Sequence, residues 1–235
     1  MKTQKDIFKE SEGDKWFDRN KDKTNFHNND IITLLKNLNI YPKDVLEIGC
    51  SNGHQLNEIK KEFQCICLGI DPSSKAIRQG LKKFPTLTLI KRSAENLPFV
   101  NDSFDLIIVG FCFYLCDRED LFVIASEIDR CLKNNGTLII KDFYPPFPYK
   151  NKYAHHKGIY SYKMDYSKMF SWNPDYITVT KIMLDPKSVE LKDKPDEREG
   201  IIVLKKLKQF AYITDPFKKN KRELLKETVK RKKIK

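Results

Sequence analysis

The segment Val45-Leu46-Glu47-Ile48-Gly49-Cys50-Ser51-Asn52-Gly53 is the most informative stretch of the sequence. Its first residues form a short apolar run that ends at Gly49, and apolar side chains then recur at helical spacing through Leu56 and Ile59. This pattern predicts a strand, a tight turn and a helix. Glycine lets the backbone approach a ligand closely, and the start of a helix presents free amide donors. The turn is therefore predicted to hold a nucleotide-like ligand.

Two common nucleotide-binding loops do not fit this turn. A dinucleotide-binding loop requires G-x-G-x-x-G, but only Gly49 and Gly53 are present, and His54 stands where the third glycine should be. A Walker loop is also excluded, because no Gly-Lys-Ser/Thr sequence follows. Taken alone, the two glycines are more typical of a simple turn than of a ligand-binding loop.

A carboxylate at the end of the next predicted strand favours ligand binding. The apolar run at 65–70 ends at Asp71, which Pro72 follows. In an open parallel sheet, a carboxylate at that position lies at the ligand crevice and can accept hydrogen bonds from both hydroxyls of a ribose. Alone, Asp71 could equally cap the helix predicted to begin at Ser73. Together with the glycine turn about twenty residues upstream, it indicates a ribose-binding crevice.

Strands and helices alternate along the rest of the chain. Further strands are predicted at 87–90, 104–109, 137–141, 177–184 and 200–207, and helices at 31–38, 73–84 and 121–132, with a turn at Asn135-Gly136. This order predicts a doubly wound, mostly parallel α/β sheet with helices on both faces. The predicted division is an N-terminal helical cap or lid at 1–40, a main domain at 41–210 with an aromatic insertion at 142–175, and a basic tail at 211–235.

A third motif, Ser93-Ala94-Glu95-Asn96-Leu97-Pro98-Phe99, precedes Asp102-Ser103-Phe104-Asp105 at the start of the strand predicted at 104–109. With this motif included, residues 45–141 closely resemble the class I S-adenosylmethionine-dependent methyltransferase family, in its type 11-like branch. The resemblance implies a three-layer, Rossmann-like fold with a mostly parallel seven-stranded sheet whose last strand is antiparallel. It also implies S-adenosyl-L-methionine as the cofactor and methyl transfer as the reaction.

The resemblance assigns cofactor contacts to individual residues. The glycine turn would line the methionine part, Asp71 with Pro72 would hold the ribose, Ala94-Glu95 would flank the adenine, and Gly110 with the residues after it would face the sulfonium. Trp16-Phe17-Asp18-Arg19-Asn20 resembles an N-terminal lid motif, although a Trp-Phe pair is also typical of core packing. In a closed lid, Arg19 would contact the methionine carboxylate. The predicted cofactor residues are Trp16, Arg19, Glu47, Gly49, Cys50, Ser51, Gly53, Asp71, Pro72, Ala94, Glu95, Gly110 and Phe111.

The aromatic insertion is predicted to receive the acceptor, because loops after strand ends form the ligand crevice of such sheets. His155 and His156 are the candidate general bases, since the ordinary histidine pKa of about 6.5 suits proton removal at neutral pH. The alternative is that they are two polar residues on a surface loop. Tyr144-Pro145-Pro146-Phe147 looks like the motif of amino methyltransferases but follows the fifth predicted strand instead of the fourth. A small polar acceptor, such as a sugar or sugar nucleotide, is favoured over RNA, and a non-catalytic cofactor-binding protein is the remaining alternative.

Composition limits the other classes of function. The net charge is +12, but residues 218–235 hold ten basic and two acidic residues, so the excess charge belongs mainly to the tail. Nucleic acid is therefore a less favoured partner. The six cysteines show no CxxC spacing, which indicates reduced thiols and no metal site. No secretory signal is recognised, and the longest apolar run, at 106–116, is too short to span a membrane, so a cytoplasmic location is expected. The sequence does not indicate an oligomeric state.

Overall fold

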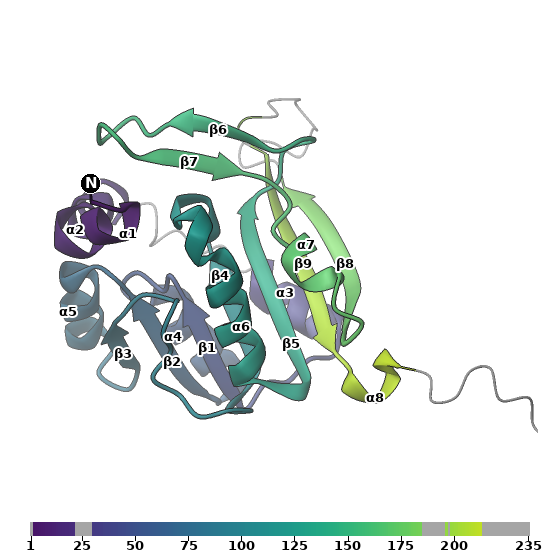
Figure 1. Cartoon of the computed structure of the whole chain (residues 1–235). Helices are drawn as coiled ribbons and strands as arrows, with labels where there is room; N and C mark the ends of the chain where they lie inside the picture. Colours follow the sequence, from purple (N-terminus) through teal and green to yellow (C-terminus); the bar gives the residue numbers. More distant parts are fainter. Residues whose placement is uncertain (1, 22–29, 185–195, 197, 213–235) are drawn as a thin grey trace, which may run out of the picture.

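In the computed structural model of the chain, the described residues are 2–21, 30–184, 196 and 198–212. A seven-stranded sheet forms the centre, in the order β3-β2-β1-β4-β5-β9-β8 (Figure 1). β1 to β5 run parallel, whereas β9 is antiparallel to both of its neighbours. This topology confirms the predicted mostly parallel sheet with an antiparallel last strand. The strands are β1 (Asp44–Ile48), β2 (Ile66–Asp71), β3 (Thr88–Lys91), β4 (Phe104–Gly110), β5 (Leu132–Phe143), β8 (Tyr176–Leu184) and β9 (Glu199–Lys206).

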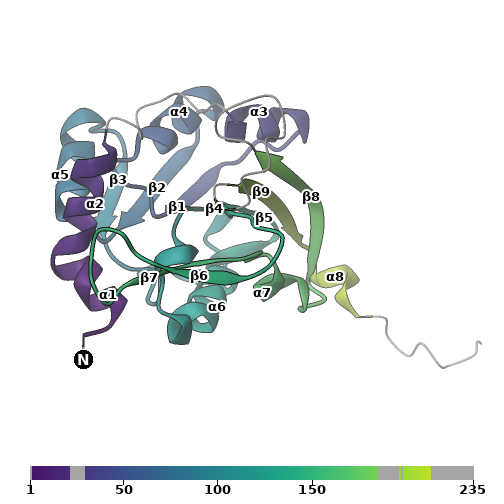
Figure 2. The same cartoon turned by 90° about the horizontal axis from the view of Figure 1, so that it is seen from above.

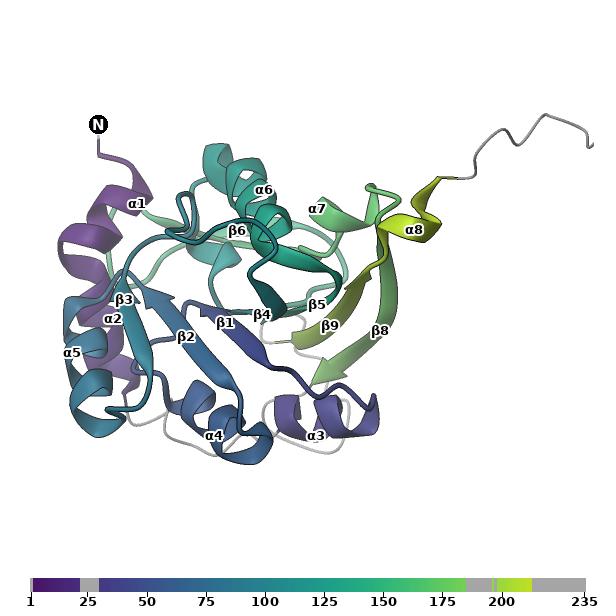
Figure 3. The same ribbon diagram turned by 90° about the horizontal axis from the view of Figure 1, so that it is seen from below.

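Helices cover both faces of this sheet, as the doubly wound pattern predicted. One face carries α3 (Asp30–Asn37), α4 (His54–Phe63) and α5 (Ser74–Lys83), and the other carries α6 (Leu121–Cys131) and α7 (Lys168–Ser171) (Figure 3). Successive residues of a strand point to opposite faces. In β1, Val45 packs into the core on the α4 side, and Leu46 packs into the core on the α6 side.

The structure decides against one alternative, the capping of a helix by Asp71, and changes one local prediction. Helix α5 is capped by Ser73, whose hydroxyl accepts a hydrogen bond from the amide of Ala76 at 3.0 Å. The Asp71 side chain is therefore not the cap of α5, and it accepts hydrogen bonds from backbone amides of the loops instead. The turn expected at Asn135-Gly136 lies inside β5, because Leu132 pairs with Phe104 and the pairing resumes only at Thr137. The intervening residues bulge out, and Asn135 adopts a φ of 64°.

The N-terminal residues and a hairpin lie over the carboxyl ends of the parallel strands (Figure 2). The N-terminal segment, called the lid below, comprises α1 (Gln4–Ile7), the π-helical turn η1 (Phe8–Glu12) and α2 (Gly13–Asn20). The hairpin pairs β6 (Tyr149–Lys152) with β7 (Tyr160–Lys163), two strands that the sequence pattern did not predict. The short 3-10 turns η2 (Phe113–Leu115) and η3 (Arg118–Asp120) follow β4.

The chain after β9 forms α8 (Lys208–Ala211) and is described only as far as residue 212. The rest of the predicted basic tail, 213–235, lies outside the described residues. Among the described residues, no helix has both the length and the apolar content that crossing a membrane requires.

Candidate active site

The loop between β1 and α4 contains three residues in the left-handed region, Gly49 (φ 78°), Ser51 (φ 50°) and Gly53 (φ 74°). The amides of Gly49 and Cys50 both donate to the carbonyl oxygen of Ile70, at 2.9 and 3.0 Å. A Cβ added at Gly49 would lie 2.9 Å from the carbonyl oxygen of Gly110. The loop after β1 and the end of β4 are therefore in backbone contact, and this contact requires glycine at position 49.

Asp71, at the end of β2, holds the same loop in place. Its Oδ2 accepts a hydrogen bond from the amide of Ser51 at 2.9 Å, and its Oδ1 accepts one from the amide of Ser73 at 2.8 Å. Burial raises the pKa of Asp71 to about 6 because desolvation disfavours the charged form. Each carboxylate oxygen has a second lone pair, so Asp71 can still accept hydrogen bonds from a ligand.

Glu47 and Ser51 carry buried polar atoms without a partner among the described residues. The Glu47 side chain is 4% exposed. Its Oε1 accepts a hydrogen bond from Gln55 Nε2 at 2.7 Å, but its Oε2 and the hydroxyl of Ser51 have none. Burial, together with the nearby charge of Asp71, raises the pKa of Glu47 to about 8. Buried polar atoms are nearly always paired, so these two atoms require a partner from a ligand or a bound water molecule.

A pocket of about 870 Å³, including its open mouth, lies beside this loop. A Cβ added at Gly110 would meet only Glu47 Oε1, at 3.6 Å, so the wall at Gly110 borders open space. The pocket brings together eight of the predicted cofactor residues: Trp16, Gly49, Asp71, Pro72, Ala94, Glu95, Gly110 and Phe111.

Other predicted cofactor residues do not line the pocket. The sulfur of Cys50 packs against Gly69 in the core, and Gly53 faces Leu87 and Leu89 of the β3 region. Glu47 and Ser51 do not line the pocket either, although Glu47 Oε1 would lie 3.6 Å from a Cβ at Gly110, which does. Among the described residues, no cluster of His, Cys, Asp and Glu could hold a metal ion.

The lid forms the roof of the pocket. Lys9 pairs with Glu95 at 2.8 Å, and Lys5 pairs with Asp120 at 2.8 Å. Farther along, Asp14 Oδ1 accepts hydrogen bonds from the hydroxyl of Ser73 at 2.7 Å and from the amide of Lys75. The lid is thus attached on both sides of the pocket, and Trp16 forms part of the pocket wall.

Arg19 lies at the junction of the lid and the hairpin instead of in the pocket. Its guanidinium pairs with Glu12 and donates to the hydroxyl of Tyr153 at 3.0 Å. The same hydroxyl donates to Glu12 Oε1 at 3.1 Å, whereas Glu12 Oε2 is buried without a partner among the described residues. Sequence spacing gave no signal for this cluster, because Tyr153 is 141 positions from Glu12.

The segment after β4 borders the other side of the pocket. Phe111 has a φ of 45°, a left-handed conformation that is uncommon outside glycine. The rings of Phe111 and Tyr114 both meet Phe143 edge to face, at 5.6 and 5.0 Å between centroids. Asp142, 2% exposed, accepts hydrogen bonds from the amides of Tyr114 (3.3 Å) and Phe143 (2.7 Å). Burial raises its pKa to about 7. Asp142 was not predicted as a site residue, although it lies one position before the end of β5 and Asp71 is the last residue of β2.

The structure does not bring His155 and His156 to the pocket. Both lie in the loop that joins β6 to β7, where His155 is exposed and its ring meets that of Tyr153 at 5.3 Å. His156 Nδ1 lies 2.7 Å from the carbonyl oxygen of Lys157. Of the motif-like segment after β5, Phe147 is 65% exposed and none of its four residues lines the pocket.

Comparison with known proteins gives matches to methyltransferases. Residues 45–136 match a family model described as a methyltransferase domain. A demethylmenaquinone methyltransferase of Thermotoga maritima is 32% identical over 110 residues, which cover 46% of this chain and 47% of that protein. A tRNA U34 carboxymethyltransferase of Sulfurimonas denitrificans is 28% identical over 116 residues, 47% of this chain and 38% of that protein. The matches therefore span about half, or less, of the length of these relatives.

Among solved structures, the N1-methyltransferase of 1,6-didemethyltoxoflavin from Burkholderia thailandensis has a similar fold, with a TM-score of 0.59. It is 14% identical, and the match covers 75% of this chain and 76% of that protein, which was solved with S-adenosylhomocysteine bound.

Proposed function

The chain carries a domain of the class I S-adenosylmethionine-dependent methyltransferase family, type 11-like branch, and we propose that it transfers the methyl group of S-adenosyl-L-methionine to a small polar acceptor. One observation carries this proposal. The pocket joins the glycine contact between β1 and β4 to the Asp71 carboxylate, under a lid and beside two unpaired buried polar atoms.

The residues of this region suit the parts of the cofactor. Asp71 would accept hydrogen bonds from the ribose hydroxyls, and Ala94 with Glu95 would flank the adenine. The unpaired Oε2 of Glu47 would accept a hydrogen bond from the ammonium of the methionine part. Burial favours the neutral form of Glu47, and a cation beside the carboxyl group would favour its ionised form. Gly110 leaves room for the ligand because it has no side chain. Arg19 would reach the methionine carboxylate only after leaving Glu12, so its role depends on lid movement.

The bound cofactor supplies a methyl group on a sulfonium, which an acceptor can displace directly. The chain then has to orient the acceptor and exclude water, and these effects account for most of the rate gain in such reactions. The lid would exclude water. Asp142 would position the segment after β4, because its oxygens accept backbone amides of that segment. We assign it no proton-transfer role, and the two histidines, which lie away from the pocket, receive none either.

For the acceptor, we keep a sugar or sugar nucleotide as the proposed class. Tyr160 and Tyr162 of the hairpin present flat rings with hydroxyl groups, which suit a polar ring-shaped ligand. We also propose a cytoplasmic location, because the six cysteines are free thiols and thiols stay reduced in the cytosol.

The experiment that tests this function uses tritium-labelled S-adenosyl-L-methionine and a fractionated extract of the source cells. Label transferred to a small-molecule fraction is the expected result. Transfer to RNA or protein would contradict the proposed acceptor class but not methyl transfer. Absence of transfer from a protein that binds the cofactor would favour a non-catalytic role.

A further inference from the structure

The hairpin segment 149–163 has an unusual charge composition. It contains four lysines, two histidines and four tyrosines, and no aspartate or glutamate. Electrostatic attraction at this segment therefore favours anions.

The pairing of β6 with β7 places two of these lysines and two of the tyrosines on one face. Lys150 lies opposite Tyr162, and Lys152 lies opposite Tyr160. Residues that face each other across a ladder, and residues two apart in a strand, share a face. Lys150, Lys152, Tyr160 and Tyr162 form this surface, called the basic-aromatic face below. On the opposite face, Ser161 is buried.

The contacts of the basic-aromatic face leave its lysines available. Lys150 Nζ lies 4.9 Å from the centre of the Tyr160 ring. Lys150 and Lys152 are exposed, and neither has a carboxylate partner within the described ranges of the chain. The Arg118 guanidinium lies 4.2 Å from the centre of the Tyr162 ring. Because Arg118 also donates to the hydroxyl of Tyr166 and to two carbonyl oxygens, it fixes Tyr162 and adds positive charge there.

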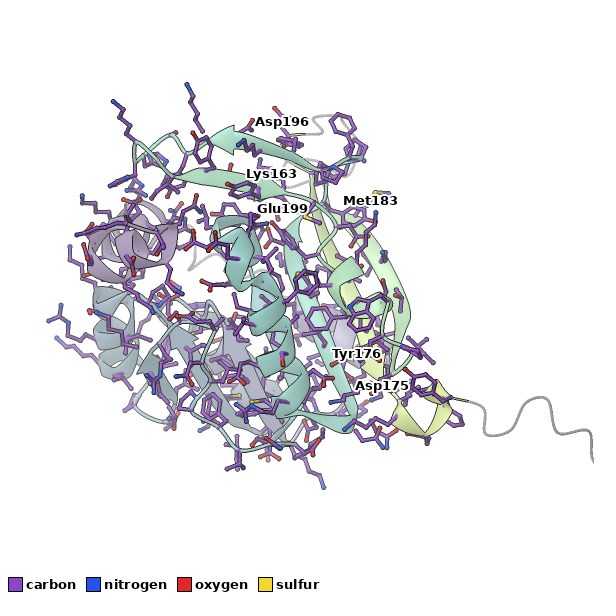
Figure 4. The ribbon with its side chains drawn as sticks, in the orientation of Figure 1. Lys163, Asp175, Tyr176, Met183, Asp196 and Glu199 are labelled. Carbon is purple, nitrogen blue, oxygen red and sulfur yellow. The ribbon has the colours of Figure 1, made fainter. Side chains whose placement is uncertain are left out.

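The hairpin also adjoins the pocket. The amide of Tyr160 donates to Gln4 Oε1 of the lid at 2.7 Å, and β7 packs against η2, whose Leu115 lines the pocket. Carboxylates near the mouth are already engaged: Asp117 accepts the amides of Gln4 and Lys5, and Asp120 pairs with Lys5. Figure 4 shows Lys163 at the end of β7, near Glu199; this lysine lies 3.8 Å from the centre of the Phe143 ring and belongs to the inner face.

We propose that the basic-aromatic face binds the diphosphate and base of a nucleoside diphosphate carried by the acceptor, a proposal that rests on the proposed function and deepens it. Lys150 and Lys152 are about 7 Å apart along the strand, so their ammonium groups can bracket a diphosphate. A flat base stacks on Tyr160 or Tyr162, as bases stack on aromatic side chains elsewhere. The attached group would then extend toward the lid and η2, the elements through which the hairpin adjoins the pocket. Two lysines on a four-residue strand match one diphosphate better than an RNA backbone, which needs a longer basic track.

The test uses the full-length protein saturated with S-adenosylhomocysteine and measures binding by calorimetry. The probes are uridine diphosphate, uridine diphosphate glucose, inorganic pyrophosphate and a short uridine oligoribonucleotide. The two uridine nucleotides should bind more tightly than pyrophosphate, which lacks a base. The double variant K150E/K152E should weaken the binding of both uridine nucleotides about tenfold or more. Tyr160→Leu should weaken the binding of the two nucleotides but leave the binding of pyrophosphate unchanged.

The matched control is K82E/K83E, which changes the charge equally at exposed positions at the end of α5 and should leave nucleotide binding unchanged. Affinity for S-adenosylhomocysteine should be the same in all variants, so a failure of the proposed function would appear separately, as lost cofactor binding in the wild type. The proposal is overturned if the nucleotides do not bind at millimolar concentration, if K150E/K152E binds them normally, or if the oligoribonucleotide binds more tightly than they do.

Discussion

The glycine contact between β1 and β4 allows stability and cofactor binding to be separated by two similar substitutions. In Gly49→Ala, an L-residue must adopt a φ of 78° and place its Cβ 2.9 Å from the carbonyl oxygen of Gly110. The left-handed conformation alone costs about 1–2 kcal/mol. With the close contact added, we expect a loss of about 2 kcal/mol or more, which lowers the melting temperature by roughly 4–8 °C for a chain of this size.

Gly110→Ala should behave in the opposite way. Its new methyl group meets only Glu47 Oε1 at 3.6 Å, an ordinary contact, so the melting temperature should stay near that of the wild type. The methyl group nevertheless occupies space in the pocket wall that the cofactor would fill. Overfilling a packed site costs about 1–3 kcal/mol, which corresponds to a roughly fivefold to hundredfold loss of affinity.

Thermal unfolding followed by circular dichroism, and calorimetric titration with S-adenosylhomocysteine, measure the two effects. Gly49→Ala serves as the stability control for Gly110→Ala. The reasoning is refuted if Gly110→Ala binds S-adenosylhomocysteine as tightly as the wild type, or if it loses stability as Gly49→Ala is expected to do.

Three further predictions concern buried carboxyl groups whose pKa values burial raises. Because the pKa of Asp71 is about 6, affinity for S-adenosylhomocysteine should fall as the pH decreases below that value, whereas Asp71→Asn should bind more weakly with little pH dependence; calorimetry at several pH values tests this. Glu47, with a pKa of about 8, is mostly protonated at neutral pH, so arrival of a ligand ammonium should release a proton. Titrations in buffers of different ionisation enthalpy should show this release in the wild type and not in Glu47→Gln. Asp142 has a folded pKa of about 7, above its unfolded value of about 3.9, so its contribution to the free energy of unfolding is present at low pH and lost as the pH rises towards 7. In urea denaturation, the free energy of unfolding should decline less over that pH range in Asp142→Asn than in the wild type. An equal decline in both proteins would contradict this assignment.

The parts of the site that the sequence predicted are those encoded by neighbouring residues. Gly49 and Asp71 each directly follow a short apolar run, and the parallel topology brings such positions together at one edge of the sheet. The same reasoning applied to β5 would have found Asp142. Ser73, and not Asp71, caps α5, which a one-dimensional pattern cannot distinguish because both residue types are good caps.

The parts that the sequence did not predict depend on contacts between distant segments. The β6–β7 hairpin lacks the alternation of apolar and polar residues that marks a strand, since its two strands consist only of Tyr, Lys, Asn and Ser residues. His155 and His156 were placed near the acceptor from loop position alone, but a loop of this length can direct its tip toward the lid, and it does so here. The cluster of Glu12, Arg19 and Tyr153 joins the lid to the hairpin and has no signature within either segment.

The most direct test of the central claim is photocrosslinking of tritium-labelled S-adenosyl-L-methionine to the wild-type protein, followed by mapping of the labelled peptides. Excess unlabelled S-adenosylhomocysteine should compete away the label, and the labelled peptides should contain Trp16 or the Gly110–Phe111 segment, which border the pocket. Label that competitor does not displace, or label confined to peptides away from the pocket, would contradict the assignment of this pocket to the cofactor.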